Sequence, residues 1–449
     1  MRNIDTYAAK QAELCTQCGM FEPELYTEYG VKRGLRDLNG QGVVTGLTNI
    51  SSVTSMREEN GKLIPCEGEL LYRGYDVCDL IKGAGNHDKI YEEAAYLLLF
   101  GDLPTVTQLD EFHDVISENM TLPTNFTRDV IMKAPEADIM SSMTKSILTL
   151  AGYDDQKNDL SIPNVLRQSI QLIGTFPMLA AYSYHAYNYY KNCESMFVHR
   201  PDPSLSLTEN FLRLLRPDMQ FTELEARTLD VAFLLHMEHG GGNNSTFTTR
   251  VVTSSGSDTY SAIAAAMSSL KGRRHGGANL MVMEMMDDIK NNVSDTFDEE
   301  EIADYLTRIV RKETFDRKGL IYGMGHAVYS ISDPRERVFR GFVESLAGEK
   351  GHGDDLRLYE SIEKLAPEII ARERRIYKGV SPNVDFYSGF VYEMMGIPRE
   401  LFTPIFAIAR IVGWSAHRIE ELVEDSKIMR PAYKSLVKKK EYEAIENRD

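Results

Sequence analysis

Hydrophobic side chains recur at helical spacing from about residue 88 to the end of the chain, which predicts a mainly helical protein. Thr222-Glu-Leu-Glu225 has the pattern of a capping box and predicts the start of a helix that ends near Glu238. A second helix is predicted from Asp258 to Leu270, and a third between Gly276-Gly277 and Lys290. The small and methionine-rich faces of these segments favour close packing between helices.

Only one region has the pattern of strands. Val43 to Val53 is rich in β-branched residues, and Asn60-Gly61, a dipeptide that favours a tight turn, separates it from Leu63 to Leu71. We therefore expect one small β-hairpin, at about residues 43–72, beside the helices. The basic segment Lys434 to Lys440 is expected to be a solvated helix end.

The length of 449 residues predicts two domains or one large helical assembly. A hydrophobic share of 43% and a charged share of 26% are typical of a globular protein, and no apolar run approaches the roughly 18 residues that span a bilayer. With 50 Lys and Arg against 67 Asp and Glu, the net charge of −17 disfavours nucleic acid and anionic membranes as partners. The first 15 residues lack a targeting pattern, so we expect a cytoplasmic location.

The five cysteines are sparse and odd in number, as expected for free thiols in a reducing compartment. Cys15 and Cys18 have a spacing that can bind zinc, but no second Cys or His pair accompanies them. We therefore expect two free thiols there and no metal.

Three of the ten histidines stand beside glycine clusters, and glycine lets a ligand approach the backbone closely. A fourth segment combines an aspartate with a turn that ends in Ser and Gly. These four candidate segments are His239-Gly-Gly-Gly242, His275-Gly-Gly277, Gly323-Met-Gly-His326 and Asn383-Val-Asp-Phe-Tyr-Ser-Gly389.

Two of these residues have positions that suit acid–base chemistry. His275 precedes a predicted helix N-terminus, where the helix dipole disfavours the imidazolium, so we expect a neutral ring that donates a hydrogen bond to an enol or enolate oxygen. Asp385 could be the general base that removes a proton next to a carbonyl. On spacing alone, a helix-capping role for Asp385 toward Ser388 or Gly389 is an equal alternative.

Three arginines accompany this pattern, and arginine binds carboxylates through two parallel hydrogen bonds. Arg335 follows His326 by nine residues, Arg410 lies in an apolar helical segment, and Arg430 precedes a proline. Each alone would be a surface residue by default. Together they suggest a clamp for a di- or tricarboxylate.

The ordered motifs resemble those of one family. The segments Leu270 to Asn279, Gly323 to Tyr329 with Asp333-Pro-Arg335, and Pro382 to Gly389 are similar to the three signature segments of citrate synthase. Other segments resemble the family in the same order, and the resemblance extends from about residue 40 to residue 432. These are Glu67 to Asp76, Glu238 to Asn243 and Gly413-Trp-Ser-Ala-His417.

The resemblance implies an all-α, two-domain citrate synthase-like fold, with the predicted hairpin as a small N-terminal addition. It implies a large domain at residues 1–277, including an N-terminal extension at 1–40, a small domain at 278–393 that closes over the substrates, and a return to the large domain at 394–449. It also implies a homodimer.

The resemblance further implies that the chain condenses acetyl-CoA with oxaloacetate and water to give citrate and CoA, with no permanent cofactor and no metal. Asp385 would remove a proton from the acetyl methyl group, His275 would bond the enol, and His326 would bond the carbonyl of oxaloacetate. The remaining expected contacts divide by substrate. His239, Arg335, Arg410 and the partner subunit's Arg430 would bind oxaloacetate, Phe406 would line the acetyl end, and Gly323, Met324, Gly325 and Asn383 would receive CoA.

Two positions depart from the pattern of many relatives, because Ala327 and Ser330 stand where a cation is common. Other cations must then hold the CoA phosphates. Residues 308–340 contain eight Lys and Arg against four acids, which predicts a basic region near the cofactor. The candidate cations are Arg337, Arg372, Arg374, Arg375 and Lys378.

Three other functions compete with this interpretation. Propionyl-CoA could replace acetyl-CoA to give 2-methylcitrate, because one added methylene changes affinity by only about 1–3 kcal/mol. His236 and His239, three residues apart with Glu238 beside them, could bind zinc in a hydrolase. A non-catalytic helical scaffold is the third alternative, and the presence of His275, His326 and Asp385 argues against it.

Overall fold

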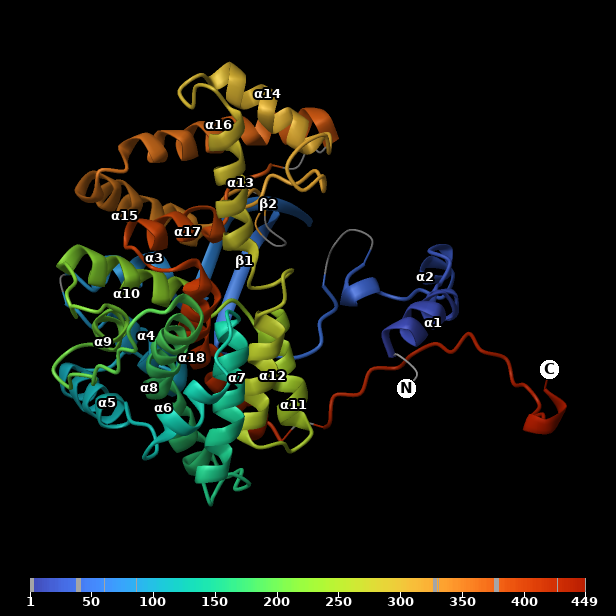
Figure 1. Cartoon of the computed structure of the whole chain (residues 1–449), viewed down its shortest axis with the longest axis horizontal. Helices are drawn as coiled ribbons and strands as arrows, with labels where there is room; N and C mark the ends of the chain where they lie inside the picture. Colours follow the sequence, from blue (N-terminus) through green and yellow to red (C-terminus); the bar gives the residue numbers. More distant parts are fainter. Residues whose placement is uncertain are drawn as a thin grey trace. The chain divides into compact units, whose positions relative to one another are not determined.

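The computed structural model describes residues 4–37, 42–59, 61–85, 87–325, 329, 331–374, 379–425 and 427–448. The described chain is mainly helical, which confirms the prediction from hydrophobic spacing (Figure 1). It divides into two compact units, one formed by residues 47–428 and the other by residues 1–46 together with 429–449. Among the described residues, no helix is both long and apolar enough to cross a membrane.

The larger unit is built around two long buried helices, α8 and α18, which pack against each other and against their neighbours. The helices of this group are α3 (Val77–Gly83), α4 (Ile90–Phe100), α5 (Val106–Glu118), α6 (Phe126–Asp129), α7 (Ile139–Leu150), α8 (Ile162–Tyr187), α9 (Leu207–Leu215), α10 (Glu223–Met237), α11 (Asn244–Ser254), α12 (Thr259–Leu270) and α18 (Phe402–Val423). Short turns of 3₁₀ or π geometry join some of them, namely η2 (Ile131–Lys133), η3 (Ala151–Tyr153), η4 (Asn188–Asn192) and η5 (Arg399–Leu401).

A second group of helices in the same unit packs within itself and lies at the top of Figure 1. Its members are α13 (Ala278–Asn292), α14 (Glu299–Val310), α15 (Pro334–Lys350), α16 (Gly353–Arg374) and α17 (Val384–Met394). Helix α17 packs against both α13 and α15, and α14 packs against α16. The group follows α12 in the chain and leads into α18, so the chain enters and leaves it next to the core helices.

The three helices predicted from capping and glycine signals are confirmed. In α10 the Thr222 hydroxyl accepts from the backbone of Glu225, and the Glu225 carboxylate accepts from the backbone of Thr222. The side chain of Asp258 caps α12, and α13 begins at Ala278, directly after the glycine pair.

The hairpin is present, but the predicted position of its first strand is wrong. The strands are β1 (Ser51–Glu59), β2 (Lys62–Tyr72) and β3 (Tyr75–Asp76), in the order β1-β2-β3, all antiparallel. Residues 43–50 form no strand, because the ladder begins where Ser51 pairs with Tyr72, the last residue of β2. Glu59 pairs with Lys62, so the connection has two residues, and Gly61 has the positive φ of 74° that such a turn requires.

The smaller unit combines both chain ends. It contains α1 (Ile4–Gly19), α2 (Glu24–Glu28), η1 (Arg33–Leu35) and η6 (Ile445–Asn447). None of its described residues is buried. The prediction of a helix end at residues 434–440 is wrong, since that segment has no regular structure, and it lacks the apolar face that would stabilise a helix by burial.

Candidate active site

His275 lies in a tight turn between α12 and α13. Its backbone N–H donates to the carbonyl of Gly272 at 2.8 Å, and the N–H of Gly276 donates to the carbonyl of Leu270 at 2.8 Å. A Cβ atom at position 276 would lie 2.3 Å from that carbonyl oxygen, so only glycine fits there. The glycine next to this histidine therefore fixes the turn from which the ring projects.

The His275 ring is neutral, and its hydrogen bonds define its tautomer. Its Nε2 lies 3.0 Å from the Ser245 hydroxyl and 3.3 Å from the Ser245 backbone N–H. Because a backbone N–H can only donate, Nε2 is an acceptor and the ring proton resides on Nδ1. Burial and the charge of Arg410 lower the pKa of His275 to about 4. Nδ1–H is thus a neutral donor, the state that stabilisation of an enolate oxygen requires.

Ser245 is itself held in place. It is buried at the start of α11, where the side chain of Asn243 caps the helix. The indole N–H of Trp414 donates to its hydroxyl oxygen at 3.1 Å, and that hydroxyl lies 3.0 Å from Asn243 Oδ1. The only tryptophan of the chain thereby supports the orientation of His275 through Ser245.

Asp385 is the second residue of α17. The cap of this helix is Asn383, whose side chain accepts the backbone N–H of Asp385 at 3.0 Å, so the alternative of a capping role for Asp385 is wrong. Burial raises the pKa of the Asp385 carboxyl to about 6, with a further rise from Asp333 and a partial offset by Arg335 and Arg410. A carboxylate with this pKa is a stronger base than an ordinary aspartate and is still ionised at neutral pH.

Two buried arginines approach this carboxylate. The Arg335 guanidinium donates to Asp333 through Nε at 3.0 Å and Nη2 at 2.7 Å. Arg410 donates from Nε to the carbonyl of His236 at 2.7 Å and lies 4.5 Å above the centre of the Phe406 ring. In the part of the chain that the structure describes, Arg410 Nη1 is buried without a hydrogen-bond partner.

The electrostatic coupling of these groups shows that they share one site. Burial lowers the pKa of Arg410 to about 10, Glu238 opposes this fall, and Arg335 adds to it. Arg410 in turn lowers the pKa values of both His275 and Asp385. Charges influence one another to this extent only at short range, so Arg410 lies near both the candidate donor and the candidate base.

His239 follows the end of α10 and faces Tyr329. Its Nε2 lies 3.2 Å from the Tyr329 hydroxyl, and the two rings meet edge to face at 5.5 Å. The Tyr329 ring packs directly on β2, where a Cβ at Gly68 would lie 2.5 Å from it and 2.3 Å from the Ser332 carbonyl oxygen. The strand thus supports the loop that faces His239.

A buried network fixes the segment from residue 238 to α11. Glu238 Oε1 accepts from the Ser51 hydroxyl at 2.8 Å, the Gly240 backbone N–H at 2.6 Å and His417 Nε2 at 2.9 Å. The other nitrogen of His417 accepts from Arg250 Nε at 3.0 Å. Because Arg250 lies on α11 with Ser245, the His417 ring joins both ends of the segment that carries His239.

The Gly323-Met-Gly325 loop is joined to the start of α17. The Gly325 N–H donates to the Ser381 carbonyl at 2.7 Å, and Asn383 bonds the carbonyls of Gly323 and Gly325 at 2.9 and 2.8 Å. Gly323 has a φ of 79°, and a Cβ there would lie 2.8 Å from the Phe386 ring. The loop is therefore tied to the residues that directly precede Asp385. His326, Ala327 and Ser330 lie outside the described residues.

Arg430 belongs to the smaller unit, where its side chain is exposed. The predicted residues that the structure brings together are thus His275, Asp385, Arg335, Arg410 and Phe406 around one centre, with His239, Asn383 and the Gly323–Gly325 loop attached to it. Sequence reasoning did not find the supporting residues. These are Ser245 and Arg250, which lie outside the family-like segments, and Glu238, Asp333, Tyr329, Trp414 and His417, which lie within those segments but were given no supporting role.

The zinc alternative is contradicted by the partners of its ligands. His236 Nε2 lies 2.9 Å from the Tyr392 hydroxyl, whereas His239 faces Tyr329 and Glu238 bonds His417. Among the described residues, no group of three or more His, Cys, Asp or Glu side chains could hold a metal ion.

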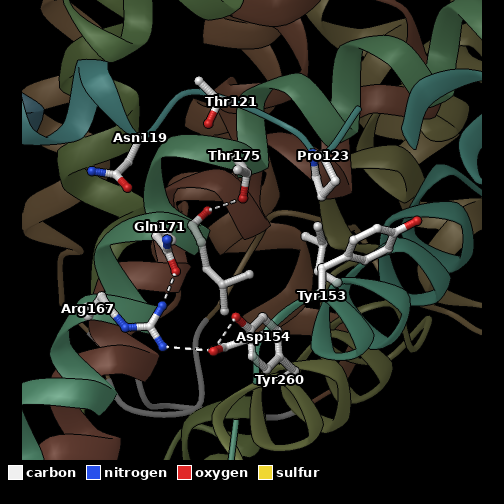
Figure 2. Close-up of a pocket in the computed structure, with 11 residues that line it drawn as sticks. Asn119, Thr121, Pro123, Tyr153, Asp154, Arg167, Gln171, Thr175 and Tyr260 are labelled. Atoms are coloured by element: carbon white, nitrogen blue, oxygen red, sulfur yellow. Dashed lines mark hydrogen bonds and ion pairs between the residues drawn. The ribbon is translucent and has the colours of Figure 1, made fainter. Parts of the chain in front are cut away.

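A separate pocket of about 160 Å³ shares no lining residue with this site (Figure 2). Its polar groups bond one another. Arg167 bonds both carboxylate oxygens of Asp154, at 3.0 and 2.9 Å, and also Gln171 at 2.8 Å, and the Tyr260 hydroxyl bonds Asp154 at 3.0 Å. Because these polar side chains bond one another, a structural role accounts for their presence in the pocket.

Comparisons with known proteins agree with one another. The family model described as citrate synthase, C-terminal domain, matches residues 37–432. A citrate synthase of Corynebacterium glutamicum is 34% identical over 81% of this chain and 79% of its own length. A 2-methylcitrate synthase of Shewanella oneidensis is 33% identical over 81% of this chain and 87% of its own, and a citrate/2-methylcitrate synthase of Bacillus subtilis is 33% identical over 87% and 93%.

A solved structure that is similar to this chain is also a citrate synthase. Citrate synthase of Thermoplasma acidophilum, in a ternary complex with carboxymethyl coenzyme A and oxaloacetate, has a TM-score of 0.75 and 25% sequence identity to this chain. The likeness covers 93% of this chain and 99% of that one.

Proposed function

This chain belongs to the citrate synthase family, as its motifs predicted, and we propose that it condenses acetyl-CoA with oxaloacetate and water to give citrate and CoA. Membership makes the chain an acyltransferase with the all-α, two-domain fold of that family. One observation carries the proposal for the reaction. A neutral His275 with its proton on Nδ1 and an Asp385 with a raised pKa are both half-buried and both coupled to the buried Arg410.

The first step is removal of a proton from the methyl carbon of the acetyl group. Asp385 accepts this proton, and the electron pair of the C–H bond forms the enol or enolate, whose oxygen is bonded by His275 Nδ1–H. A neutral donor suits this task because it matches the modest basicity of an enol oxygen without giving up its proton. The side-chain oxygen of Asn383 accepts the backbone N–H of Asp385 at 3.0 Å and so holds Asp385 in position.

In the second step the enol carbon attacks the carbonyl carbon of oxaloacetate. We propose that His326 bonds and protonates the oxygen of that carbonyl, and that water then cleaves the citryl thioester to citrate and the CoA thiol. Arg410 Nη1, buried and without a partner among the described residues, supports carboxylate binding at Arg410, and Arg335 and His239 complete that set. Phe406, under the Arg410 guanidinium, lines the acetyl end.

We extend the proposal to the domains. Residues 278–393 close over the substrates and the chain returns to the large domain from residue 394, with Gly323, Met324, Gly325 and Asn383 receiving CoA. The bonds between the Gly323–Gly325 loop and the start of α17 support this, because they tie the CoA loop to the residues that directly precede Asp385. Closure would also exclude water from the enol.

We also propose a homodimer in which Arg430 reaches the partner's site. The smaller unit has no buried residue among those described, and large apolar side chains such as Tyr433 and Val437 are 93% and 87% exposed. Such a unit lacks a core of its own, so a second copy of the chain is needed to cover its apolar residues.

Formation of 2-methylcitrate from propionyl-CoA is the second candidate, favoured by the name of the Shewanella oneidensis relative. Measuring kcat/KM for acetyl-CoA and propionyl-CoA with the purified enzyme decides between them. We expect the higher value for acetyl-CoA, and a higher value for propionyl-CoA would reverse the assignment. Failure to form either product from oxaloacetate would refute the proposed reaction.

A further inference from the structure

The CoA molecule carries a charge of roughly −4 at neutral pH, so its phosphates need cations in the cleft. The cations expected for this role are already engaged. Arg337 bonds Glu67 at 2.5 Å, and Arg374 bonds the backbone of Gly319. Arg372 bonds Glu373 at 3.1 Å and the Thr307 hydroxyl at 3.1 Å. Arg375 and Lys378 lie outside the described residues.

Several cations of the basic segment at residues 308–340 are also neutralised, by acidic residues that lie outside this segment in the sequence. Arg311 bonds Glu373 at 2.8 Å. Arg340 lies within 3.5 Å of three glutamates on α15 and α16, namely Glu344, Glu360 and Glu363. The paired cations of this segment therefore offer no free anion site, which leaves Lys312 and Arg317 as its alternative.

Two other arginines stand beside the reacting centre. Arg273 and Arg274 directly precede His275 in the turn between α12 and α13, and both are exposed. Within the described parts of the chain, neither guanidinium has a recorded hydrogen bond or ion pair, unlike the nearby Lys271, which bonds Asp138 at 3.0 Å. Two adjacent arginines without a carboxylate partner are a positive site beside a catalytic turn.

Arg273 also lies within electrostatic range of the residue that precedes the loop expected to receive CoA. Burial raises the pKa of the Tyr322 hydroxyl, and the positive charge of Arg273 opposes that rise. Tyr322 directly precedes Gly323 in the chain. The guanidinium of Arg273 therefore lies near the start of the Gly323–Gly325 loop, although the two residues are far apart in sequence.

A thioester placed at His275 Nδ1 and an adenosine end placed at the Gly323–Gly325 loop require the rest of CoA to pass between the turn and the loop. We propose that Arg273 and Arg274 bind the phosphate groups of CoA there, an inference that rests on the proposed function. Arginine suits phosphate because its planar guanidinium offers parallel N–H donors. The same turn then holds the thioester through His275 and the phosphates through its two arginines.

The test compares two acyl donors in the Arg273→Ala/Arg274→Ala enzyme. S-acetylpantetheine has the thioester and the pantetheine arm but no phosphate, so it reports on the reacting centre alone. For acetyl-CoA we expect KM to rise about 10- to 100-fold, because the variant loses one or two charge-assisted contacts to phosphate. The kcat should stay within about threefold of the wild-type value. For S-acetylpantetheine we expect kcat/KM to stay unchanged.

Two further variants serve as controls. Lys271→Ala removes a cation of the same turn that is already paired, and KM for acetyl-CoA should stay within about twofold. Arg273→Lys/Arg274→Lys keeps the charge and should recover most of the affinity. An unchanged KM for acetyl-CoA in the double alanine variant would overturn the inference, as would an equal loss for both acyl donors, which would mean that the turn itself was disturbed.

Calorimetric titration with CoA separates this inference from the proposed function. CoA should bind the wild-type enzyme more tightly than the double alanine variant by the same 10- to 100-fold, while pantetheine should not distinguish them. If that difference appears but no acyl-CoA is turned over, the proposed reaction fails and the phosphate site stands. If Lys312→Ala/Arg317→Ala shows the loss instead, the phosphates bind to the segment between α14 and the Gly323–Gly325 loop and our inference is wrong.

Discussion

Replacing Asp385 by asparagine should stabilise the folded protein while it abolishes turnover. Burial raises the pKa of this carboxyl to about 6, against the usual 3.8 of an aspartate. At 1.36 kcal/mol for each tenfold change in proton affinity, the ionised carboxylate costs the folded state about 3 kcal/mol above pH 6. Asparagine carries no charge, so the variant avoids that cost and also loses the base, which contributes about 10²- to 10⁴-fold to the rate.

The sign of this effect depends on pH. Because the pKa of Asp385 is higher in the folded chain than in the unfolded one, the folded state binds the extra proton, and its advantage is lost as pH rises from about 4 to about 6. Wild type and Asp385→Asn should therefore have similar stability near pH 4. Their difference should grow through this window and stay constant above it.

Urea denaturation between pH 4 and 8, at one fixed protein concentration, measures this difference together with kcat/KM. Asp154→Asn is the matched control. Although burial raises the pKa of Asp154, hydrogen bonds from Gln168 and Arg167 lower it overall, so loss of that charge should destabilise the protein at pH 8. The reasoning is refuted if Asp385→Asn is equally stable or less stable than wild type at pH 8.

Two further predictions concern Asp385 and His417. At low oxaloacetate, kcat/KM for acetyl-CoA should fall as pH drops below about 6, because Asp385 becomes protonated. At saturating oxaloacetate the midpoint of this pH profile should move to higher pH. A kcat/KM that does not change between pH 5 and 7 would exclude Asp385 as the base. His417→Ala should lower the free energy of unfolding by about 3–5 kcal/mol, because it leaves the buried Glu238 and Arg250 without their shared partner. The control is His185→Ala, because among the described residues the buried His185 ring bonds a backbone carbonyl and no charged group. Urea denaturation of both variants measures how much more stability the His417 variant loses. Equal losses in the two variants would show that His417 has no special role.

Local signals explain which parts of the fold could be predicted. The capping box of Thr222 and the side-chain cap of Asp258 act within four residues, so sequence alone located α10 and α12. The first strand was misplaced because its β-branched residues begin at position 43, whereas the pairing partner on β2 starts opposite Ser51. Helix α1 was missed because none of its residues is buried, so its apolar pattern has no clear face.

The candidate site shows the same difference between local signals and contacts that are distant in sequence. His275 and Asp385 were predicted because glycines and helix starts lie next to them in the sequence. Their supports were not, since the contacts from Ser245 to His275 and to Trp414 span 30 and 169 residues. No local pattern records such a contact. The engagement of Arg337 with Glu67 was hidden for the same reason, and this is why charge counting along the chain overestimated the free cations.

The electrostatics of the site favour a dianionic ligand and prepare the base for use after that ligand binds. Burial and the charge of Arg335 lower the pKa of Arg410 to about 10, which Glu238 only partly opposes, whereas Asp333 raises the pKa of Arg335 and keeps that guanidinium charged. Both arginines also lower the pKa of Asp385, so their positive charge weakens it as a base. Two carboxylates bound at these guanidinium groups would neutralise them, and the pKa of Asp385 would rise because its burial is then less compensated. Oxaloacetate binding would thus strengthen the base that acts on the acyl donor, which links proton removal to the presence of the acceptor that must trap the enol.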